Sequence, residues 1–349
     1  MDLAYLWFWI VGFLFIGYFV LDGFDFGVGM SLPFLGKDDI ARRQIINTIG
    51  PVWDLNETWV IVAGAALFAS FPEWYATLFS GFYLPLLLIL LALIARGVSF
   101  EYRHQRESLK WKRGFDRMIV IGSAVPAFLW GVAFANIVQG VPLDADHEYV
   151  GTLFTLLNPY GILGGLVTLL LFFTHGVYFV ALKTDGQVRT DARALARKSG
   201  LVTIVFAALF LVWTIIQAAN NQAPLLLGVV AFSGIAALTL IGSWVANLRD
   251  REGTAFTLGA ITIVTAVAAL FFALFPNVMP STLEPGSGLT IENASSTDYT
   301  LTIMSWAALI FLPLVLAYQA WTYWVFRRRI SVDHIPAHVA PAASSTSTT

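Results

Sequence analysis

Two clusters of polar residues interrupt apolar segments near the start of the chain, and carboxyl groups in such places can carry protons. The first is in "FVLDGFDFGVG", where Asp22 and Asp25 stand three residues apart. The second is in "IGPVWDLNETWV", where Asp54 and Glu57 have the same spacing and Asn56 lies between them. Residues three apart share one face of a helix. Because a carboxylate inside a membrane segment is costly, such residues usually have a function and a nearby partner.

The second cluster has two interpretations. Trp53 and Trp59 bracket Asp54, Asn56 and Glu57, and together they could form a proton or ion path that opens on the cytoplasm. In the simpler interpretation, acids in the first turn of a helix complement its macrodipole, and tryptophans near a membrane end belong to the aromatic belt. The sequence alone leaves both open.

The first cluster also has a structural alternative to direct chemistry. Asp22 and Asp25 could cap a helix or pair with Arg96, which the pattern puts at the cytoplasmic end of the third span. The glycines around them resemble a dinucleotide-binding fingerprint, but that motif requires a preceding strand. No strand is expected here, so we exclude it.

His175 is the only one of the five histidines that the pattern puts inside a membrane span. Histidine is a common axial ligand of haem iron, yet one intramembrane histidine cannot hold a centre of several haems. A histidine hydrogen-bonded to a neighbour is the commoner case. The chain has no cysteine, which excludes disulfides and thiolate metal sites, and we predict no metal site in this chain.

The elements that position these residues are membrane helices. The 349 residues are 58% hydrophobic and 12% charged, with a mean hydropathy of +0.74, which is outside the range of soluble domains. A span of the hydrocarbon layer needs about 20 apolar residues. The sequence predicts nine such spans, near residues 5–27, 50–70, 76–96, 118–138, 160–182, 200–219, 224–246, 255–275 and 300–325.

The positive charges orient these spans. All 20 Lys and Arg residues fall in, or at the membrane border of, alternate connectors. Because basic residues accumulate on the cytoplasmic side, we predict that the N-terminus lies outside and the C-terminus in the cytoplasm. The basic stretch "RGVSFEYRHQRESLKWKRGFDR" is explained by this rule and by contact with anionic headgroups, so it does not indicate nucleic-acid binding.

We predict one all-α integral membrane domain over residues 1–330 and a disordered tail over 331–349, whose Ser, Thr, Pro and Ala composition is typical of disorder. A short repeat, "FANIVQGVP" and "FALFPNVMP", suggests two four-helix bundles, 1–140 and 158–280, with helix 300–325 added. Gly23 and Gly27 have the spacing that permits close helix packing.

A set of motifs gives the chain a family resemblance. They occur in order from the first span to the last and are "LDGFDFGVG", "RRQIINTIGPVWDLNETW", "AGAALFASFP", "FSGFY", "GVAFANIVQGVP", "LLNPYGILGG", "FPNVMPST" and "YQAWTYWVFRR". As a set they resemble subunit II of cytochrome bd quinol oxidases. The family usually has W-D-G-N in the second span, whereas Leu55 replaces the glycine here, so local packing at this cluster can differ.

The resemblance implies a respiratory complex of a bacterial or archaeal plasma membrane that passes electrons from menaquinol or ubiquinol to oxygen. It implies that haem b and haem d are held by a homologous subunit I, which forms a pseudo-symmetric heterodimer with this chain, and that this chain has no haem and no complete active site. It also allows a small accessory single-helix subunit, bound membrane lipids and a quinone or lipid site in this subunit.

The resemblance further implies roles for the two polar clusters. Asp54 would be the first proton relay from the cytoplasm, and Trp53, Asn56 and Glu57 would shape or extend the path toward oxygen reduction, which contributes to the proton motive force. The remaining candidates would support this path or the structure around it, and they are Trp59, Asp22, Asp25 and Arg96.

Two other functions remain open on the residues alone. Intramembrane acids and repeat-like halves also mark ion-coupled secondary transporters, although here the acids gather toward the cytoplasmic end and no pair of broken helices is evident. The chain could also be a purely structural subunit, with its carboxylates serving assembly only.

Overall fold

The computed structural model describes residues 2–283 and 286–332. Nearly all of the predicted tail, residues 333–349, lies outside the described residues. The described chain is almost entirely helical, with one two-stranded hairpin. In chain order its elements are α1 Leu3–Leu35, α2 Asp39–Ile49, α3 Trp53–Ser70, α4 Pro72–Gly81, α5 Tyr83–Tyr102, α6 Leu109–Gln139, α7 Leu153–Leu156, α8 Pro159–Lys183, α9 Gly186–Asn220, α10 Leu226–Leu248, α11 Glu252–Leu274, β1 Asn277–Met279, β2 Leu289–Thr290, α12 Ile291–Ala294 and α13 Asp298–Val325.

Among the described residues, eight helices are long and apolar enough to cross a membrane, namely α1, α5, α6, α8, α9, α10, α11 and α13. The predicted span over 50–70 corresponds to α3, which is outside this set. It has 18 residues, and its first turns contain Asp54, Asn56 and Glu57, so its apolar part is shorter than the roughly 20 residues of a full span. A ninth span therefore stays a prediction.

Several helices begin or end away from the predicted bounds. The span expected at 76–96 is wrong in its bounds, because the segment breaks at Phe82 into the short helix α4 and the longer helix α5. Helix α9 begins at Gly186, well before the predicted 200, because its basic first turns remain helical outside the apolar segment. The stretch after Lys37 forms α2, an amphipathic helix that the sequence analysis treated as a connector.

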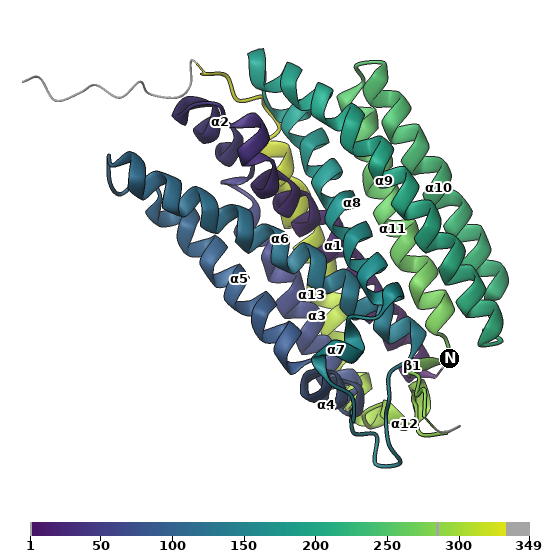
Figure 1. Cartoon of the computed structure of the whole chain (residues 1–349). Helices are drawn as coiled ribbons and strands as arrows, with labels where there is room; N and C mark the ends of the chain where they lie inside the picture. Colours follow the sequence, from purple (N-terminus) through teal and green to yellow (C-terminus); the bar gives the residue numbers. More distant parts are fainter. Residues whose placement is uncertain (1, 284–285, 333–349) are drawn as a thin grey trace, which may run out of the picture.

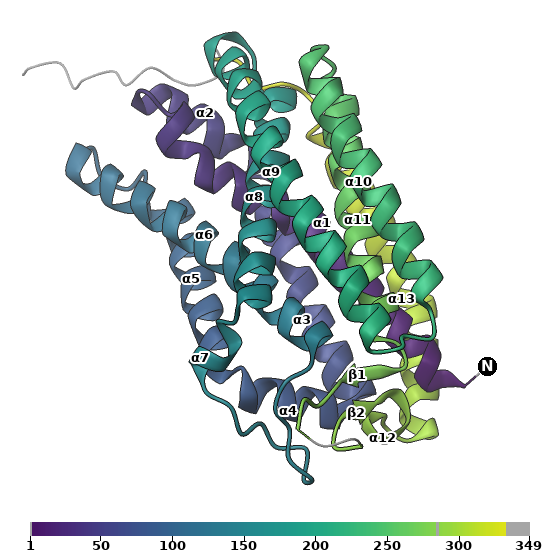
Figure 2. The ribbon, with the colours of Figure 1, turned by 45° about the vertical axis from the view of Figure 1, so that its right-hand side comes forward.

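Figures 1 and 2 show the long helices running side by side, with α5 and α6 on one side, α9, α10 and α11 on the other, and α1 and α8 between them. Helix α2 lies at one end of the bundle, and the N-terminus, α4, α12 and the hairpin lie at the other. We call the end with α2 the basic end, since the Lys- and Arg-rich connections gather there. Which side of the membrane it faces stays a prediction.

Helix α1 is the central element. It packs against α3 and α6 and also against α8 and α11, so these contacts do not decide the predicted division into two four-helix bundles. At Gly27 its backbone touches α8 directly, because a Cβ atom there would lie 2.0 Å from the Phe172 carbonyl oxygen and 2.7 Å from the Gly176 Cα atom. A Cβ on Gly176 would in turn lie 2.4 Å from the Gly27 Cα atom. Only glycine fits at either position.

Helix α13 packs least. Only 6% of its most apolar stretch is buried, and it contacts mainly α1 and α3. Its exposed apolar side chains include Trp306, Leu309, Ile310, Phe311 and Leu314. One outer face of the molecule is therefore formed by α13 beside α3.

Candidate functional site

A buried ion-pair cluster joins α1, α3 and α5 near the basic half of the bundle. Arg96 of α5 is fully buried, and its Nη2 atom lies 2.7 Å from Asp22 Oδ1 and 2.8 Å from Glu57 Oε2. Its guanidinium carbon lies 4.4 Å from the centre of the Phe26 ring, a distance at which a cation is attracted to an aromatic face. One arginine thus holds acids from the first and third helices.

The cluster continues through an amide toward the last helix. The Asn56 side chain donates from Nδ2 to Asp25 Oδ2 at 2.8 Å. Its Oδ1 atom accepts from Gln319 Nε2 at 2.9 Å and from the Tyr323 hydroxyl at 2.8 Å. Because all four side chains are mostly or fully buried, these hydrogen bonds connect α1 to α13 through the protein interior. We call the whole set, Asp22, Asp25, Asn56, Glu57, Arg96, Gln319 and Tyr323, the Arg96 cluster.

The Arg96 cluster has more acid than base. Asp22 and Glu57 share one guanidinium, and Asp25 is hydrogen-bonded to Asn56. Asp22 Oδ2 and Asp25 Oδ1 have no hydrogen-bond partner among the described residues, and neither have Arg96 Nε and Nη1. Buried polar atoms without partners are rare and call for a functional explanation. Three carboxyl groups beside one fixed positive charge can take up protons without creating an uncompensated positive charge, which is the property a proton store needs.

Asp54 stands apart from this cluster. Helix α3 begins at Trp53 after Pro51, so Asp54 is in its first turn. Its side chain is exposed and forms no hydrogen bond or ion pair with the described residues. Trp53 packs on Phe100, with ring centres 5.2 Å apart. Of the second sequence cluster, the structure thus brings Asn56 and Glu57 to Arg96 and its partners but leaves Asp54 and Trp53 outside.

Two residues of the site were missed in the sequence analysis. Gln319 and Tyr323 stand four residues apart on one face of α13. Trp59, which was predicted to support the proton path, contacts Gln319, since its Nε1 atom lies 3.5 Å from Gln319 Oε1. A buried polar pair at helical spacing in the last span was the available signal.

His175 is not part of the Arg96 cluster. It is buried in α8 and its ring stacks on Phe256, with ring centres 4.5 Å apart and an angle of 3° between planes. A Cβ atom on Gly259 would lie 2.8 Å from its Nδ1 atom. Phe256 covers one face of the imidazole and Gly259 lies against its edge, and neither ring nitrogen has a side-chain partner among the described residues.

A second ion-pair network lies at the basic end. Arg103 donates from Nε to Asp116 Oδ1 at 2.6 Å and from Nη2 to Asp39 Oδ1 at 2.8 Å. Lys112 Nζ bonds Asp39 Oδ2 at 3.1 Å, and Arg42 Nη1 bonds Asp116 Oδ2 at 3.1 Å. Partial burial opposes ionisation of Asp39, but the hydrogen bonds from Arg103 and Lys112 outweigh it and lower its pKa. We call these five residues the basic-end network.

Comparison with known proteins decides the family. The model of the family described as cytochrome bd terminal oxidase subunit II matches residues 3–326. The chain belongs to this family. It is therefore a subunit of a cytochrome bd quinol oxidase, an oxidoreductase complex of the respiratory chain, and a multi-pass protein of the plasma membrane.

Relatives in this family span nearly the whole chain. Cytochrome bd ubiquinol oxidase subunit 2 of Bacillus subtilis is 42% identical over 329 residues, which cover 93% of this chain and 96% of the relative. Cytochrome bd-I ubiquinol oxidase subunit 2 of Escherichia coli is 37% identical over 368 residues and covers 95% and 96%. A chain in the structure of bd oxidase from Geobacillus thermodenitrificans has the same fold, with a TM-score of 0.75, 18% identity and coverage of 93% and 99%.

Within the described residues, no group of three or more His, Cys, Asp or Glu side chains is arranged to hold a metal ion. The three acids of the Arg96 cluster are held by an arginine and an amide instead.

Proposed function

We propose that this subunit of the cytochrome bd oxidase conducts protons from the cytoplasm toward a haem-bearing subunit I, where haem b and haem d support the reduction of oxygen to water by menaquinol or ubiquinol. The observation that carries the proposal is the Arg96 cluster, in which one guanidinium holds the buried Asp22 and the partly exposed Glu57, and an amide holds the buried Asp25 beside them. A bilayer supplies no protons to a buried reaction, so a relay of ionisable groups must provide them. Uptake from the cytoplasm would contribute to the proton motive force.

The three acids of the Arg96 cluster differ in exposure and in hydrogen-bond partners, and we assign them different roles on that basis. Glu57 is the cluster's acid closest to the surface, with 22% of its side chain exposed, so it can exchange protons with water. Asp22 is fixed by Arg96, whereas within the described part of the chain Asp25 has only the Asn56 amide as a hydrogen-bond partner. Asp25 is therefore the carboxyl group best suited to change its protonation, while Arg96 and Asn56 hold the neighbouring oxygens in position.

A row of exposed residues on α3 supports the proposal that Asp54 lies at the interface with subunit I. Asp54 continues into a row of exposed residues along one face of α3, made of Thr58, Ile61, Ala65 and Phe68. A carboxylate on a lipid-facing row costs several kcal/mol, on the order of 2.5–3.5 at mid-membrane. A row that begins with an acid fits a protein partner better than lipid. We infer that the α3 row and neighbouring α13 face subunit I in a pseudo-symmetric heterodimer, and that Asp54 passes protons at this border.

A cavity beside the Arg96 cluster supports a bound quinone or lipid tail. It has a volume of about 430 Å³, lies between α1, α3 and α13, and is lined mainly by apolar side chains such as Trp7, Leu14 and Phe311. Trp59 forms part of its wall and also contacts Gln319 of the cluster. A long isoprenoid or acyl chain has the shape and polarity that this cavity accepts.

A pocket at the basic end supports binding of anionic membrane lipids. It has a volume of about 340 Å³ and combines Arg42, Arg113 and Arg117 with an apolar wall that includes Val120 and Ile121. Basic pockets between membrane helices are typical sites for anionic headgroups. A small accessory subunit is also compatible with the exposed helices.

The experiment is an Asp54→Asn substitution in the complete oxidase. The amide keeps the size of the side chain but cannot release a proton, so we expect an assembled complex with an unchanged reduced-minus-oxidised haem spectrum and quinol-driven oxygen uptake lowered about tenfold. Glu73→Gln is the matched control, because Glu73 is an exposed acid in α4 at the opposite end of the bundle, and its activity should equal that of the wild type.

Oxygen uptake at the wild-type rate in a fully assembled Asp54→Asn complex would remove Asp54 from the path. Loss of the haem spectrum instead of turnover would favour a purely structural subunit. Solute transport by this chain without haem would favour the transporter alternative.

A further inference from the structure

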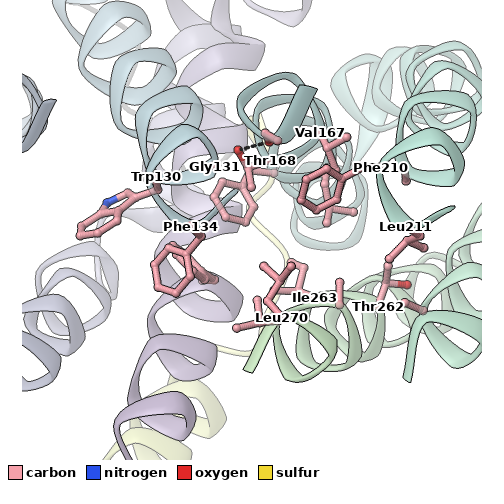
Figure 3. A pocket seen from close by; sticks show the side chains of 18 of the residues that line it. Trp130, Gly131, Phe134, Val167, Thr168, Phe210, Leu211, Thr262, Ile263 and Leu270 are labelled. Atoms are coloured by element: carbon pink, nitrogen blue, oxygen red, sulfur yellow. Dashed lines mark hydrogen bonds between the residues drawn. The ribbon is translucent and has the colours of Figure 1, made fainter. Parts of the chain in front are cut away.

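A small apolar cavity lies between the long helices, away from the Arg96 cluster. Its volume is about 60 Å³ and its walls come from α1, α6, α8, α9, α10 and α11. Figure 3 shows Phe134, Phe210, Ile263 and Leu270 among the side chains around it. None of the residues of the Arg96 cluster or of the basic-end network belongs to its wall.

The polar side chains in the wall have their hydrogen bonds elsewhere. The Thr168 hydroxyl donates to the Ala127 carbonyl oxygen at 2.6 Å. The Thr262 hydroxyl lies 2.9 Å from the Leu258 carbonyl oxygen and 3.0 Å from the Thr239 hydroxyl. The Trp130 indole donates to the Tyr18 hydroxyl at 3.1 Å. A buried water needs two to four polar partners, and these side chains offer it no free donor, so water is a poor occupant.

The volume of the cavity limits which ligands can fit. A buried water needs about 10–15 Å³, and an engineered apolar cavity of about 150 Å³ binds benzene or xenon. A space of about 60 Å³ lies between these limits and is too small for an acyl chain or a quinone ring. We propose that this cavity is a binding site for one small apolar gas molecule, of the size of xenon or dioxygen.

The surroundings of the cavity favour such a ligand. Apolar solutes leave water for hydrocarbon, so the lipid around α9, α10 and α11 is the phase in which these gases concentrate. The outer faces of the same helices expose Leu201, Val205, Leu238 and Ile261. Naming dioxygen as the natural ligand rests on the proposed oxidase function, whereas the site itself and its xenon test do not.

Crystals of the complete oxidase, pressurised with xenon, provide the test. We expect an anomalous peak between Phe210, Ile263 and Leu270. Ala236→Val adds two methyl groups from the cavity wall, where the alanine is fully buried, and should lower the peak at least fivefold. Ala231→Val makes the same change on the exposed face of α10 and should leave the peak unchanged.

Xenon bound elsewhere in the complex but absent from this cavity would overturn the proposal, as would ordered water inside it or an equal peak in Ala236→Val. If the Ala236→Val complex does not assemble, Ala266→Val fills the same cavity from α11 and carries the same expectation. Oxygen uptake does not enter this test, so failure of the proton-path proposal and failure of the gas site are told apart.

Discussion

Two arginines, Arg96 inside α5 and Arg103 at its C-cap, lie in opposite electrostatic settings. Arg96 and Arg103 are seven residues apart, about two turns of α5, and each bonds two carboxylates from other helices. The Arg96 cluster has three acids and one base, of which Asp22 and Glu57 pair with the base and Asp25 accepts from an amide. Two of the acid oxygens have no partner among the described residues. Around Arg103, three cations face two acids, and all four oxygens of Asp39 and Asp116 are bonded.

This difference predicts different roles for the two networks. In the basic-end network every acid oxygen has a cationic partner, so protonating either acid would break an existing ion pair. Such a network stabilises the packing of its helices. The Arg96 cluster can add a proton at Asp25 and keep its arginine paired with Asp22 and Glu57. We therefore expect substitutions at the basic-end network to change stability and those at Asp25 to change turnover.

The largest effect is expected at Arg96. Arg96→Met leaves Asp22 and Glu57 without their counter-ion, and breaking a buried ion pair on one side costs about 3–5 kcal/mol. The complex should assemble poorly, which haem content per membrane protein measures. Arg96→Lys keeps one positive charge and should restore part of the assembly. Normal haem content in Arg96→Met would show that the cluster needs no counter-ion.

The next largest effect is expected at Asp25. Asp25→Asn keeps an acceptor for the Asn56 amide but removes the proton-binding group, and positioned acid or base groups contribute roughly 100-fold or more to rates. We expect quinol-driven oxygen uptake to fall about 100-fold with an unchanged haem spectrum. Asp25→Glu, which keeps the carboxyl group, is the matched control and should recover much of the rate. Equal activity of both variants would assign Asp25 to packing.

A smaller and different effect is expected at Asp116. Asp116→Asn removes the negative charge that Arg42 and Arg103 share, and losing hydrogen bonds to charged groups costs about 1.5–3 kcal/mol. Thermal unfolding of the complex should begin at a lower temperature, while turnover per haem stays at the wild-type value. A slowed turnover in the intact complex would extend the proton path to the basic end and break the contrast between the two networks.

The smallest effect is the pH dependence of Asp39. Its pKa is lowered from 3.8 in the folded state, so the folded form gains stability above the unfolded value and loses it as pH falls through the folded value. The difference in thermal midpoint between wild type and Asp39→Asn should be constant from pH 7 to pH 5 and shrink below about pH 4. With 28% of this side chain exposed, water limits the effect to about 1 kcal/mol or less. A difference that grows as the pH falls would contradict the ion pairs.

The sequence predicted which segments form helices better than it predicted which side chains of different helices meet. Apolar length predicted most of the long helices, and the suggested pairing of Arg96 with the acids of the first span is present at Asp22. Gln319 and Tyr323 were missed because a polar residue in an apolar span does not reveal which helix it meets. Asp54 and Glu57 were expected to act together, but in α3 one side chain is exposed and the other turns to Arg96.

The direct contact between Gly27 and Gly176 limits how α1 and α8 can move relative to each other. Because the main chains are in direct contact at that point, α1 and α8 can approach no further there without a collision. The acids of α1 sit five and two residues before the contact. A displacement of α8 toward α1 at this point would therefore also displace the part of α1 that carries Asp22 and Asp25.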